Sequence, residues 1–458
     1  MRTWRALAVG GLLVLALAAP AGARNRFDTR LFAKIGPPGY PALSLVAPDR
    51  TVYVGTFTNA QGSDTGPSKV FAYSPAGKLL RTYTIQGQTP GSAHGVQVAA
   101  MDASGLLYLL DQNPARVLTL NPRTGAQATY GTFRDVQPCL PGNTPMDCSA
   151  TTTDNPAEPD YAAWAPDGSL YVTDYTQGLL WRVPAGGGTA HVWFTDPNLD
   201  GSLFGPAGIL LSPDRHHLLL DTSAGGATTA AAGNNPVTGE LYSLPINDDG
   251  RPGNLTKLWE SGPKEAPDGF ALAKSGNVYM SLVGPDVNQL VVISPAGKEL
   301  VRFPSDSSGA NGTDIPFDEP SSVQFDGQRI LVTNDAYISG DASHFAVFDV
   351  FAGEDGAPVY IPGLGSGSSG GYKVTVRPKR VRVDTRHRFR FKVTLRGKRV
   401  KGALITFAGR RRHTNAKGVA RVVARLHHIR RYRALVKVGT GQLQVAAATV
   451  RVRPPVTK

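Results

Sequence analysis

The chain has 458 residues, with 52 glycines, 35 prolines and a formal net charge of +13. This length exceeds one typical domain and favours two, while so much glycine and proline favours many short strands joined by turns over a helical protein. The charge is uneven, because residues 372–458 hold 26 Lys and Arg and one acid (+25), whereas the residues before them hold 22 basic and 34 acidic residues (−12).

Residues 1–23 are predicted to form a secretion signal. Arg2 and Arg5 precede an apolar run over residues 6–19, and Ala21-Gly22-Ala23 has the small-x-small pattern of a signal-peptidase site. The apolar run is too short for a membrane anchor, no stop-transfer pattern follows, and no other stretch is predicted to span a bilayer. We therefore expect a cleaved signal peptide and a mature protein that is secreted or associated with the cell envelope.

Residues 24–362 contain a repeated hairpin unit. In one copy, Pro159-Asp160 leads into an apolar strand, Pro166-Asp167-Gly168 forms a turn, and a second strand runs to Asp174. Pro, Asp and Gly supply the backbone angles of a tight turn, and alternating apolar residues predict half-buried strands. Five further copies begin at Pro41, His94, Pro206, Pro267 and Pro320.

A second hairpin separates successive copies of the first. Residues 70–78 (VFAYSPAGK) and 291–298 (VVISPAGK) are nearly the same sequence. The copies start roughly 47 to 66 residues apart, and each repeat therefore has four strands, which make one propeller blade. Six copies predict an all-β, six-bladed β-propeller over residues 24–362. A β-sandwich with similar turns is the alternative, and the long-range copy disfavours it.

The only two cysteines, Cys139 and Cys148, flank a Pro-Gly turn. In an exported chain, this spacing favours a disulfide that closes a loop. A metal or redox pair is the alternative, but the spacing fits neither and no third ligand lies nearby.

Residues 363–371 (GLGSGSSGG) are predicted to form a flexible linker, and residues 372–458 a small β-sandwich. Residues 388–395 alternate apolar residues with Arg, Lys or Thr, as expected of a strand with one face in a core and one in water. Residues 402–409 (GALITFAG) and 414–420 (TNAKGVA) resemble bacterial immunoglobulin-like (Ig-like) repeats of surface and secreted proteins.

The charge of the predicted sandwich domain favours an anionic partner. No recognition helix is evident and the chain carries an export signal, so acidic cell-envelope polymers or anionic lipid head groups fit better than a specific nucleic acid. The alternative is a solvated face that charge keeps soluble.

In a propeller, the first residues of the innermost strands face one mouth of the central channel. The repeats place at this mouth Ala42, a residue near His94 to Gln97, Asp160, Ala207, Asp268 and Ser321. Oxygen ligands that converge from several blades suit a hard cation such as calcium. Asp160 and Asp268 are the two carboxylates at these positions and are the predicted metal ligands.

Three segments resemble the SMP-30/gluconolactonase family, whose blades are similar to NHL repeats. They are residues 206–214 (PAGILLSPD), 267–272 (PDGFAL) and 320–325 (PSSVQF). The resemblance implies a six-bladed propeller and, in many members, hydrolysis of lactones with one divalent metal in the channel. The family holds this metal with a Glu on blade one, two Asn on middle blades and an Asp in a Pro-Asp-Gly motif.

Carried over to this sequence, the family pattern matches in part. Asp268 matches the Asp of Pro-Asp-Gly, a metal ligand that is also taken as the catalytic acid/base, and Asp160 replaces one Asn. Ala207 and Ala42 stand at the other two positions and offer no donor atom. The nearby donors that could supplement the site are His94, Asn234 and Asn235.

Two functional hypotheses follow from this pattern. One is a propeller that binds a ligand or partner, such as a small carbohydrate-like molecule, at the channel mouth. The other is a metal-dependent lactone hydrolase in which a metal polarises the lactone carbonyl and Asp268 transfers a proton. Three strand-end acids, Asp111, Asp174 and Asp221, recur from blade to blade and are predicted to make structural hydrogen bonds to the backbone rather than to act in catalysis.

Overall fold

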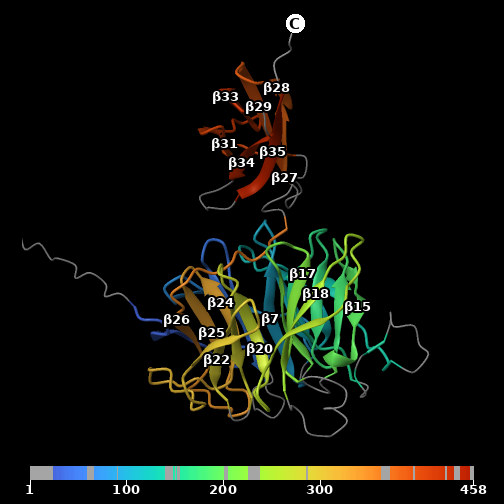
Figure 1. The fold of residues 1–458 in the computed structure, drawn as a ribbon, viewed down its shortest axis with the longest axis vertical. Coiled ribbons are helices and arrows are strands. Elements are labelled where there is room, and N and C mark those ends of the chain that lie inside the picture. Colours follow the sequence, from blue (N-terminus) through green and yellow to red (C-terminus); the bar gives the residue numbers. More distant parts are fainter. Residues whose placement is uncertain are drawn as a thin grey trace, which may run out of the picture.

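The structure is a computed structural model. It describes residues 24–58, 66–89, 91–139, 148–149, 151, 155–200, 205–224, 238–284, 287–362, 372–395, 398–428, 431–437 and 444–453. The predicted signal peptide (1–23) and linker (363–371) therefore lie outside the described residues. The described part of the chain is built from strands, with one 3-10 turn at Pro197–Leu199 (Figure 1). Within it, no helix has the length and apolar character needed to cross a membrane.

Six sheets of the first domain each contribute one blade, and the four blade strands of each pair antiparallel. From the innermost strand outward, blade 1 is β2 (Ser44–Val46), β3 (Val52–Gly55), β5 (Lys69–Tyr73) and β6 (Leu79–Thr84); blade 2 is β7 (His94–Met101), β8 (Leu107–Gln112), β9 (Ala115–Leu120) and β10 (Gln127–Thr132); blade 3 is β11 (Pro159–Trp164), β12 (Leu170–Asp174), β13 (Leu179–Val183) and β15 (His191–Thr195). Two short strands, β4 (Phe57–Thr58) and β14 (Gly188–Thr189), extend the sheet of blade 2 at its two edges.

The other three blades follow the same order. Blade 4 is β16 (Pro206–Leu211), β17 (His217–Thr222), β18 (Glu240–Pro245) and β19 (Thr256–Glu260); blade 5 is β20 (Pro267–Leu272), β21 (Val278–Leu282), β22 (Gln289–Ile293) and β23 (Glu299–Phe303); blade 6 is β24 (Pro320–Asp326), β25 (Arg329–Asn334), β26 (Ala346–Phe351) and the N-terminal β1 (Thr29–Lys34).

The innermost strands are packed around a common axis. Each contacts the next in the order β2, β7, β11, β16, β20 and β24, and β24 contacts β2 again. The N-terminal strand β1 pairs with β26, so the last sheet contains both ends of the propeller sequence. The prediction of an all-β, six-bladed propeller is confirmed.

The repeated turns form as their residues predict. In blade 3, Asp167 Oδ1 accepts a hydrogen bond of 3.0 Å from the Ser169 amide, and Gly168 takes the left-handed φ of 91° that glycine tolerates. In blade 4, Asp214 Oδ1 accepts from the His216 amide at 2.9 Å. Asp167 and Asp214 are therefore turn residues.

The space between neighbouring blades is filled by large buried side chains such as Trp181 and Tyr279.

The second domain consists of two sheets. One contains β27 (Tyr372–Arg377), β29 (Arg386–Leu395), β30 (Lys398–Arg399) and β33 (Val419–Arg425); the other contains β28 (Arg380–Arg382), β35 (Gln444–Arg453), β34 (Arg431–Lys437), β31 (Leu404–Phe407) and β32 (Arg410–His413). Phe389 and Phe391 of the first sheet pack on Phe407 of the second, with ring centroids 4.9 and 5.2 Å away. The domain is a two-sheet β-sandwich, and its likeness to Ig-like repeats stays a prediction.

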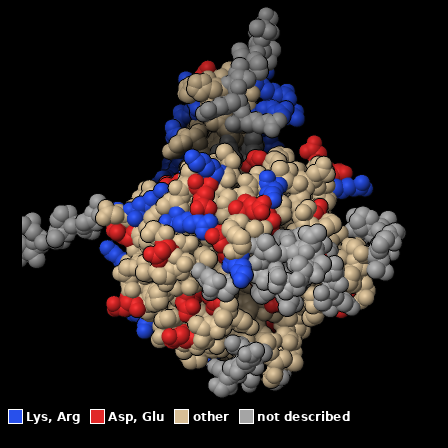
Figure 2. Space-filling model, turned by 60° about the horizontal axis from the view of Figure 1, so that its bottom comes forward, with Lys and Arg blue, Asp and Glu red and all other residues tan. Residues whose placement is uncertain are grey.

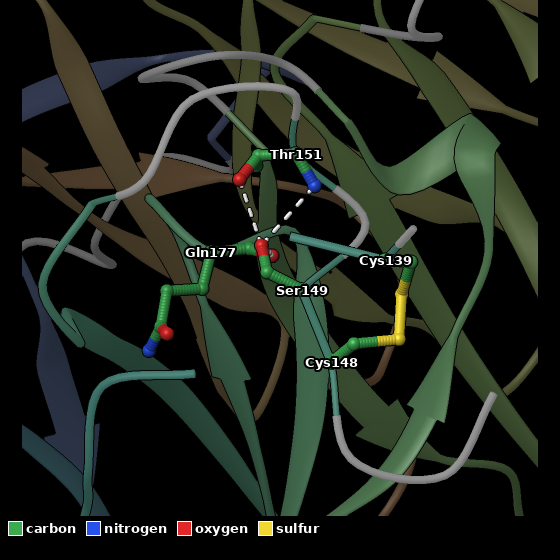
Figure 3. The surroundings of a disulfide bond; sticks show 5 residues. All are labelled: Cys139, Cys148, Ser149, Thr151 and Gln177. Carbon is green, nitrogen blue, oxygen red and sulfur yellow. Dashed lines mark hydrogen bonds between the residues drawn. A yellow bond between two sulfur atoms is a disulfide. The ribbon is translucent and has the colours of Figure 1, made fainter. Parts of the chain in front are cut away.

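The predicted disulfide is present. Cys139 and Cys148 are bonded, with their Cα atoms 4.9 Å apart (Figure 3). Beside the disulfide, the Ser149 hydroxyl donates to the Gln177 carbonyl at 2.6 Å and accepts from the Thr151 amide at 3.1 Å. These bonds tie the connection between β10 and β11 to the turn that follows β12.

Candidate ligand site at the channel mouth

Three interblade hydrogen bonds define equivalent positions at the start of the inner strands. The hydroxyls of Thr173, Ser281 and Thr333 each donate to a carbonyl at, or two residues before, the start of the inner strand of the next blade. The acceptors are Ala207 at 2.7 Å, Ser321 at 3.1 Å and Ala42 at 2.8 Å, respectively. Ala42, Ala207 and Ser321 therefore occupy the same place in their blades, as the repeats predict.

Strand pairing places Gln97, Asp160 and Asp268 at the same level in the other three blades. In each blade, one residue of the inner strand is the first to pair with the second strand. Gln97, Asp160 and Asp268 each come directly after that residue. From the sequence, the channel-mouth residue of blade 2 could be any residue from His94 to Gln97, and the structure identifies it as Gln97. Two carboxyls and one amide thus converge on this end of the channel, from blades 2, 3 and 5.

Gln97 and Asp160 are joined across neighbouring blades. The Gln97 side-chain amide donates to Asp160 Oδ1, and both side chains are buried. Gln97 Oε1 has no hydrogen-bond partner among the described residues although it is shielded from solvent. A buried acceptor without a donor is costly, so this oxygen is suited to receive a donor from a ligand or an ordered water.

Asp160 and Asp268 both hold protons more strongly than ordinary carboxyls. Desolvation raises the pKa of Asp268 to about 7, while the polar groups of the neighbouring Tyr161 hydroxyl and Gly269 amide oppose this rise. Desolvation also raises the pKa of Asp160 well above its usual value, and the charge of Asp268 is the next largest cause. Asp268 is only half-buried, so it is the more accessible of the two acids.

Asp221, on the second strand of blade 4, adds a third acid near Asp160 and Asp268. Its register in β17 matches that of Thr173, Ser281 and Thr333, the hydroxyl residues of blades 3, 5 and 6. Asp221 is fully buried, and among the described residues neither of its carboxyl oxygens has a hydrogen bond of acceptable geometry, although the amides of Gly208 and Asp221 lie close enough to lower its pKa somewhat. Desolvation and the charge of Asp268 nonetheless raise its pKa well above the usual value.

The predicted backbone hydrogen bonds of the strand-end acids are confirmed for Asp174, which accepts from the amides of Glu158 at 3.2 Å and Gln177 at 3.0 Å. Asp111 accepts instead from the side chains of Gln88 at 2.8 Å and Arg116 at 2.9 Å. The prediction is wrong for Asp221, because this residue lies one position earlier in its strand pairing than Asp174 does.

Further acids and tyrosines surround the same mouth. Burial raises the pKa of Glu158 to about 7, with the charge of Asp174 as a second cause, and burial likewise raises the pKa of Glu319 to about 7. Desolvation and the charge of Asp268 raise the pKa of Tyr175 well above its usual range. The charged side chains that raise these pKa values are themselves acids, so this end of the channel disfavours anions.

Tyr161 separates the two ends of the channel. Its side chain is buried, and its hydroxyl runs from blade 3 to donate to the Ser321 carbonyl of blade 6 at 3.0 Å. Any side chain on Gly269 would collide with this hydroxyl, so glycine is required there. Tyr161 was not among the residues predicted from the sequence. The one indication in the sequence was Gly269 of Pro-Asp-Gly, because a glycine there leaves room for a side chain from another blade.

The other end of the channel holds an apolar cavity of about 410 Å³, lined by later residues of the same inner strands, such as Ala162 and Leu210. The chain segment 357–361 also lines it, held by a 2.8 Å hydrogen bond from the Ala357 amide to the Leu272 carbonyl. The cavity and the acidic mouth are thus built from the same strands and differ in chemistry.

The described residues match the family's metal site only in part. No group of three or more His, Cys, Asp or Glu side chains within the described ranges is arranged to hold a metal ion. His94 is buried, with its Nδ1 2.9 Å from the Ser68 hydroxyl, whereas Asn234 and Asn235 lie outside the described residues. A calcium ion held by Asp160 and Asp268 remains a hypothesis.

The sequence matches no protein-family model and no curated protein. Similar solved structures include a catalytically inactive virginiamycin B lyase from Staphylococcus aureus with quinupristin (14% identity, TM-score 0.44, 70% of this chain and 98% of that chain). They also include a luciferin-regenerating enzyme (15%, 0.44, 72% and 98%) and the PQQ-bound aldose sugar dehydrogenase from Streptomyces coelicolor (12%, 0.45, 70% and 96%). These similarities concern the β-propeller fold.

Proposed function

We propose that this protein is a ligand-binding propeller whose site is the acidic mouth of the channel. The observation that carries the proposal is the convergence of Gln97, Asp160 and Asp268, where a buried amide oxygen lacks a donor and a half-buried carboxyl is accessible. A bound ligand would supply the hydrogen-bond donors that these acceptor oxygens lack, and this role requires no catalysis.

The ligand that this chemistry favours is small, polar and rich in hydrogen-bond donors, as carbohydrates are. Carboxyl and amide oxygens accept hydrogen bonds from hydroxyl groups, and a carboxylate accepts more strongly from an ammonium group. The surrounding acids, including Glu158 and Glu319, repel anions. An amino sugar should therefore bind better than a neutral sugar, and a sugar acid should bind worst.

This order can be tested by calorimetry at pH 7 with glucosamine, glucose and gluconate. We expect glucosamine to bind most tightly and gluconate most weakly, and Asp268→Asn to remove most of the preference for glucosamine. Asp214→Asn is the matched control, because it removes one carboxyl at the exposed turn of blade 4. Tightest binding of gluconate, or equal effects of the two substitutions, would refute the proposal.

Lactone hydrolysis is the second candidate, and the raised pKa of Asp268 supports it. A carboxyl with a pKa of about 7 can accept a proton from an attacking water near neutral pH. Asp160 and Asp268 would hold a divalent cation such as calcium, which would polarise the lactone carbonyl when bound. The chain itself would orient Asp268 through Tyr161 and Gly269.

Hydrolysis of glucono-1,5-lactone, followed in a pH-stat with and without calcium, tests this candidate. If Asp268 is the proton acceptor, Asp268→Asn lowers kcat by roughly 100-fold or more. Absence of turnover above the background rate in the wild-type protein with calcium would exclude gluconolactonase activity and leave the binding proposal to calorimetry.

We further propose that the protein is exported and that its basic domain retains it at an anionic cell-envelope polymer. The apolar run and small-x-small motif of residues 1–23 support export, and the +25 formal charge of residues 372–458 supports retention. N-terminal sequencing of protein from the culture medium or envelope should give a chain that starts near Arg24. An intact Met1 would contradict cleavage.

A further inference from the structure

One face of the sandwich domain carries a dense set of cations. Strand β29 alternates between core residues, such as Phe389 and Phe391, and exposed basic residues on its other face. The neighbouring strands β27 and β33 add exposed cations on that same face. The set, here called the arginine face, is Arg377, Arg386, Arg388, Arg390, Lys392, Arg421 and Arg425.

Strand register sets like charges directly opposite one another. Arg390 pairs with Arg377 of β27 on one side and with Arg421 of β33 on the other, and Arg386 pairs with Arg425. Directly opposite residues have Cβ atoms about 5 Å apart, and like charges at that distance destabilise a sheet. The row of three arginines across three strands therefore costs stability when nothing anionic is bound.

The domain supplies almost no compensating charge. Asp384 is the only acid in residues 372–458, and its carboxylate lies 2.6 Å from His427 Nδ1. Among the described residues, no ion pair involves the arginine face. In the propeller, by contrast, Arg302 bridges Glu265 and Glu299. Figure 2 shows the same difference, with Lys and Arg dominating the smaller domain and both signs mixed on the larger one.

The face is suited to phosphate but offers no platform for bases. Six of its seven cations are arginines, whose planar guanidinium groups form two parallel hydrogen bonds to a phosphate. Alternate residues on β29 lie about 7 Å apart, so Arg386, Arg388, Arg390 and Lys392 form a line of charge. The non-basic residues on this side of the three strands, Thr375, Thr394, Val419 and Val423, are not aromatic, whereas proteins that bind single-stranded nucleic acids stack bases on aromatic rings.

We propose that the arginine face binds a linear, base-free phosphate polymer of the cell envelope. The polymer would lie along β29 and neutralise the cross-strand repulsion of Arg377, Arg390 and Arg421. This site lies in a different domain from the channel mouth, so its test is independent of the function proposed for the propeller.

Long-chain inorganic polyphosphate, end-labelled for fluorescence anisotropy, is the probe for the full-length chain. The substitutions Arg388→Gln, Arg390→Gln and Arg421→Gln are combined in one variant. The matched control combines Arg410→Gln, Arg411→Gln and Arg412→Gln on β32, three exposed arginines that pair with no basic residue of β31. Both variants remove three charges from the same domain.

We expect wild-type affinity to fall steeply with salt, and the face variant to bind at least ten-fold more weakly at 50 mM salt than the control variant. Loss of three phosphate contacts should lower the salt slope by about 2. Thermal unfolding of both variants verifies that they fold. Equal weakening in the two variants, absence of wild-type binding at 50 mM salt, or tighter binding of a single-stranded DNA of equal charge would overturn the proposal.

Discussion

The two ends of the propeller channel are built from the same six strands, yet their chemistry is opposite. At the start of the strands lie Asp160 and Asp268, with Asp221 of the neighbouring strand β17 close to them, and their pKa values are raised. At the other end, apolar residues such as Leu210 surround a cavity of about 410 Å³. The repeat thus fixes the scaffold, whereas the side chains that each blade presents at an end decide the chemistry there.

Removing the tyrosine that separates the two ends should have the largest effect. Tyr161→Ala deletes a buried aromatic side chain and leaves a cavity between the ends, so we expect the free energy of unfolding to fall by about 3–5 kcal/mol. Tyr161→Phe keeps the ring but removes the hydroxyl that bonds the Ser321 carbonyl and lies beside Asp268, and it should cost about 1 kcal/mol. Urea denaturation measures the free energy of unfolding of both variants. Equal losses of unfolding free energy in the two variants would show that the packing of the Tyr161 ring does not separate the two ends.

The acidic end should make stability depend on pH. Asp268 has a pKa near 4 when unfolded and about 7 when folded, so between these values the folded state binds more protons. Its stabilising contribution is complete below pH 4 and is lost as pH rises through 7, with a slope of about 1.4 kcal/mol per pH unit.

The comparison of wild type with Asp268→Asn isolates this contribution. Between pH 4.5 and 6.5, the unfolding free energy of the wild type relative to that of Asp268→Asn should fall by about 1.4 kcal/mol for each unit that the pH rises. A difference independent of pH would contradict the raised pKa of Asp268.

The disulfide should stabilise the connection that leads into β11 and Asp160. Cys139 and Cys148 are separated by 9 residues, and closing a loop of this length contributes about 2–3 kcal/mol in the chain-entropy model. Replacing both cysteines with serine should lower the free energy of unfolding by that amount, and reducing the wild-type protein should reproduce the loss. Loss of the glucosamine preference in the double variant would show that the loop also shapes the mouth.

The smallest expected effect concerns the one blade whose interblade hydroxyl is replaced by an acid. Asp221→Thr restores the residue type that bonds the next blade at Thr173, Ser281 and Thr333, and it removes a buried carboxyl that has no hydrogen bond of acceptable geometry among the described residues. At pH 8 we expect stabilisation by about 1–2 kcal/mol.

The same substitution in blade 2 should have the opposite sign. Asp111 is hydrogen-bonded to Gln88 and paired with Arg116, so Asp111→Thr breaks a buried pair and destabilises the protein. Denaturation of both variants at pH 8 is the measurement. Destabilisation by both would mean that Asp221 has a stabilising partner.

The sequence predicted the repeat better than the site. Turn motifs such as Pro166-Asp167-Gly168 are local, so six blades and the mouth positions Asp160 and Asp268 could be read from them. Tyr161 was missed because its hydroxyl reaches a distant blade, and only tertiary packing determines that contact. Asp221 was misjudged because a shift of one residue in strand pairing changes which way a side chain points.

The central claim is that Asp268, at the acidic end, contacts the ligand. The most direct measurement is the ratio of glucosamine Kd values for Asp268→Asn and wild type, taken by calorimetry from pH 5.5 to 8. The amine titrates equally in both experiments, so the ratio isolates the carboxyl. The ratio should be near 1 at pH 5.5 and rise about ten-fold or more as pH passes through about 7, because a charge-assisted hydrogen bond then forms. A ratio that stays near 1 across this range would contradict the account.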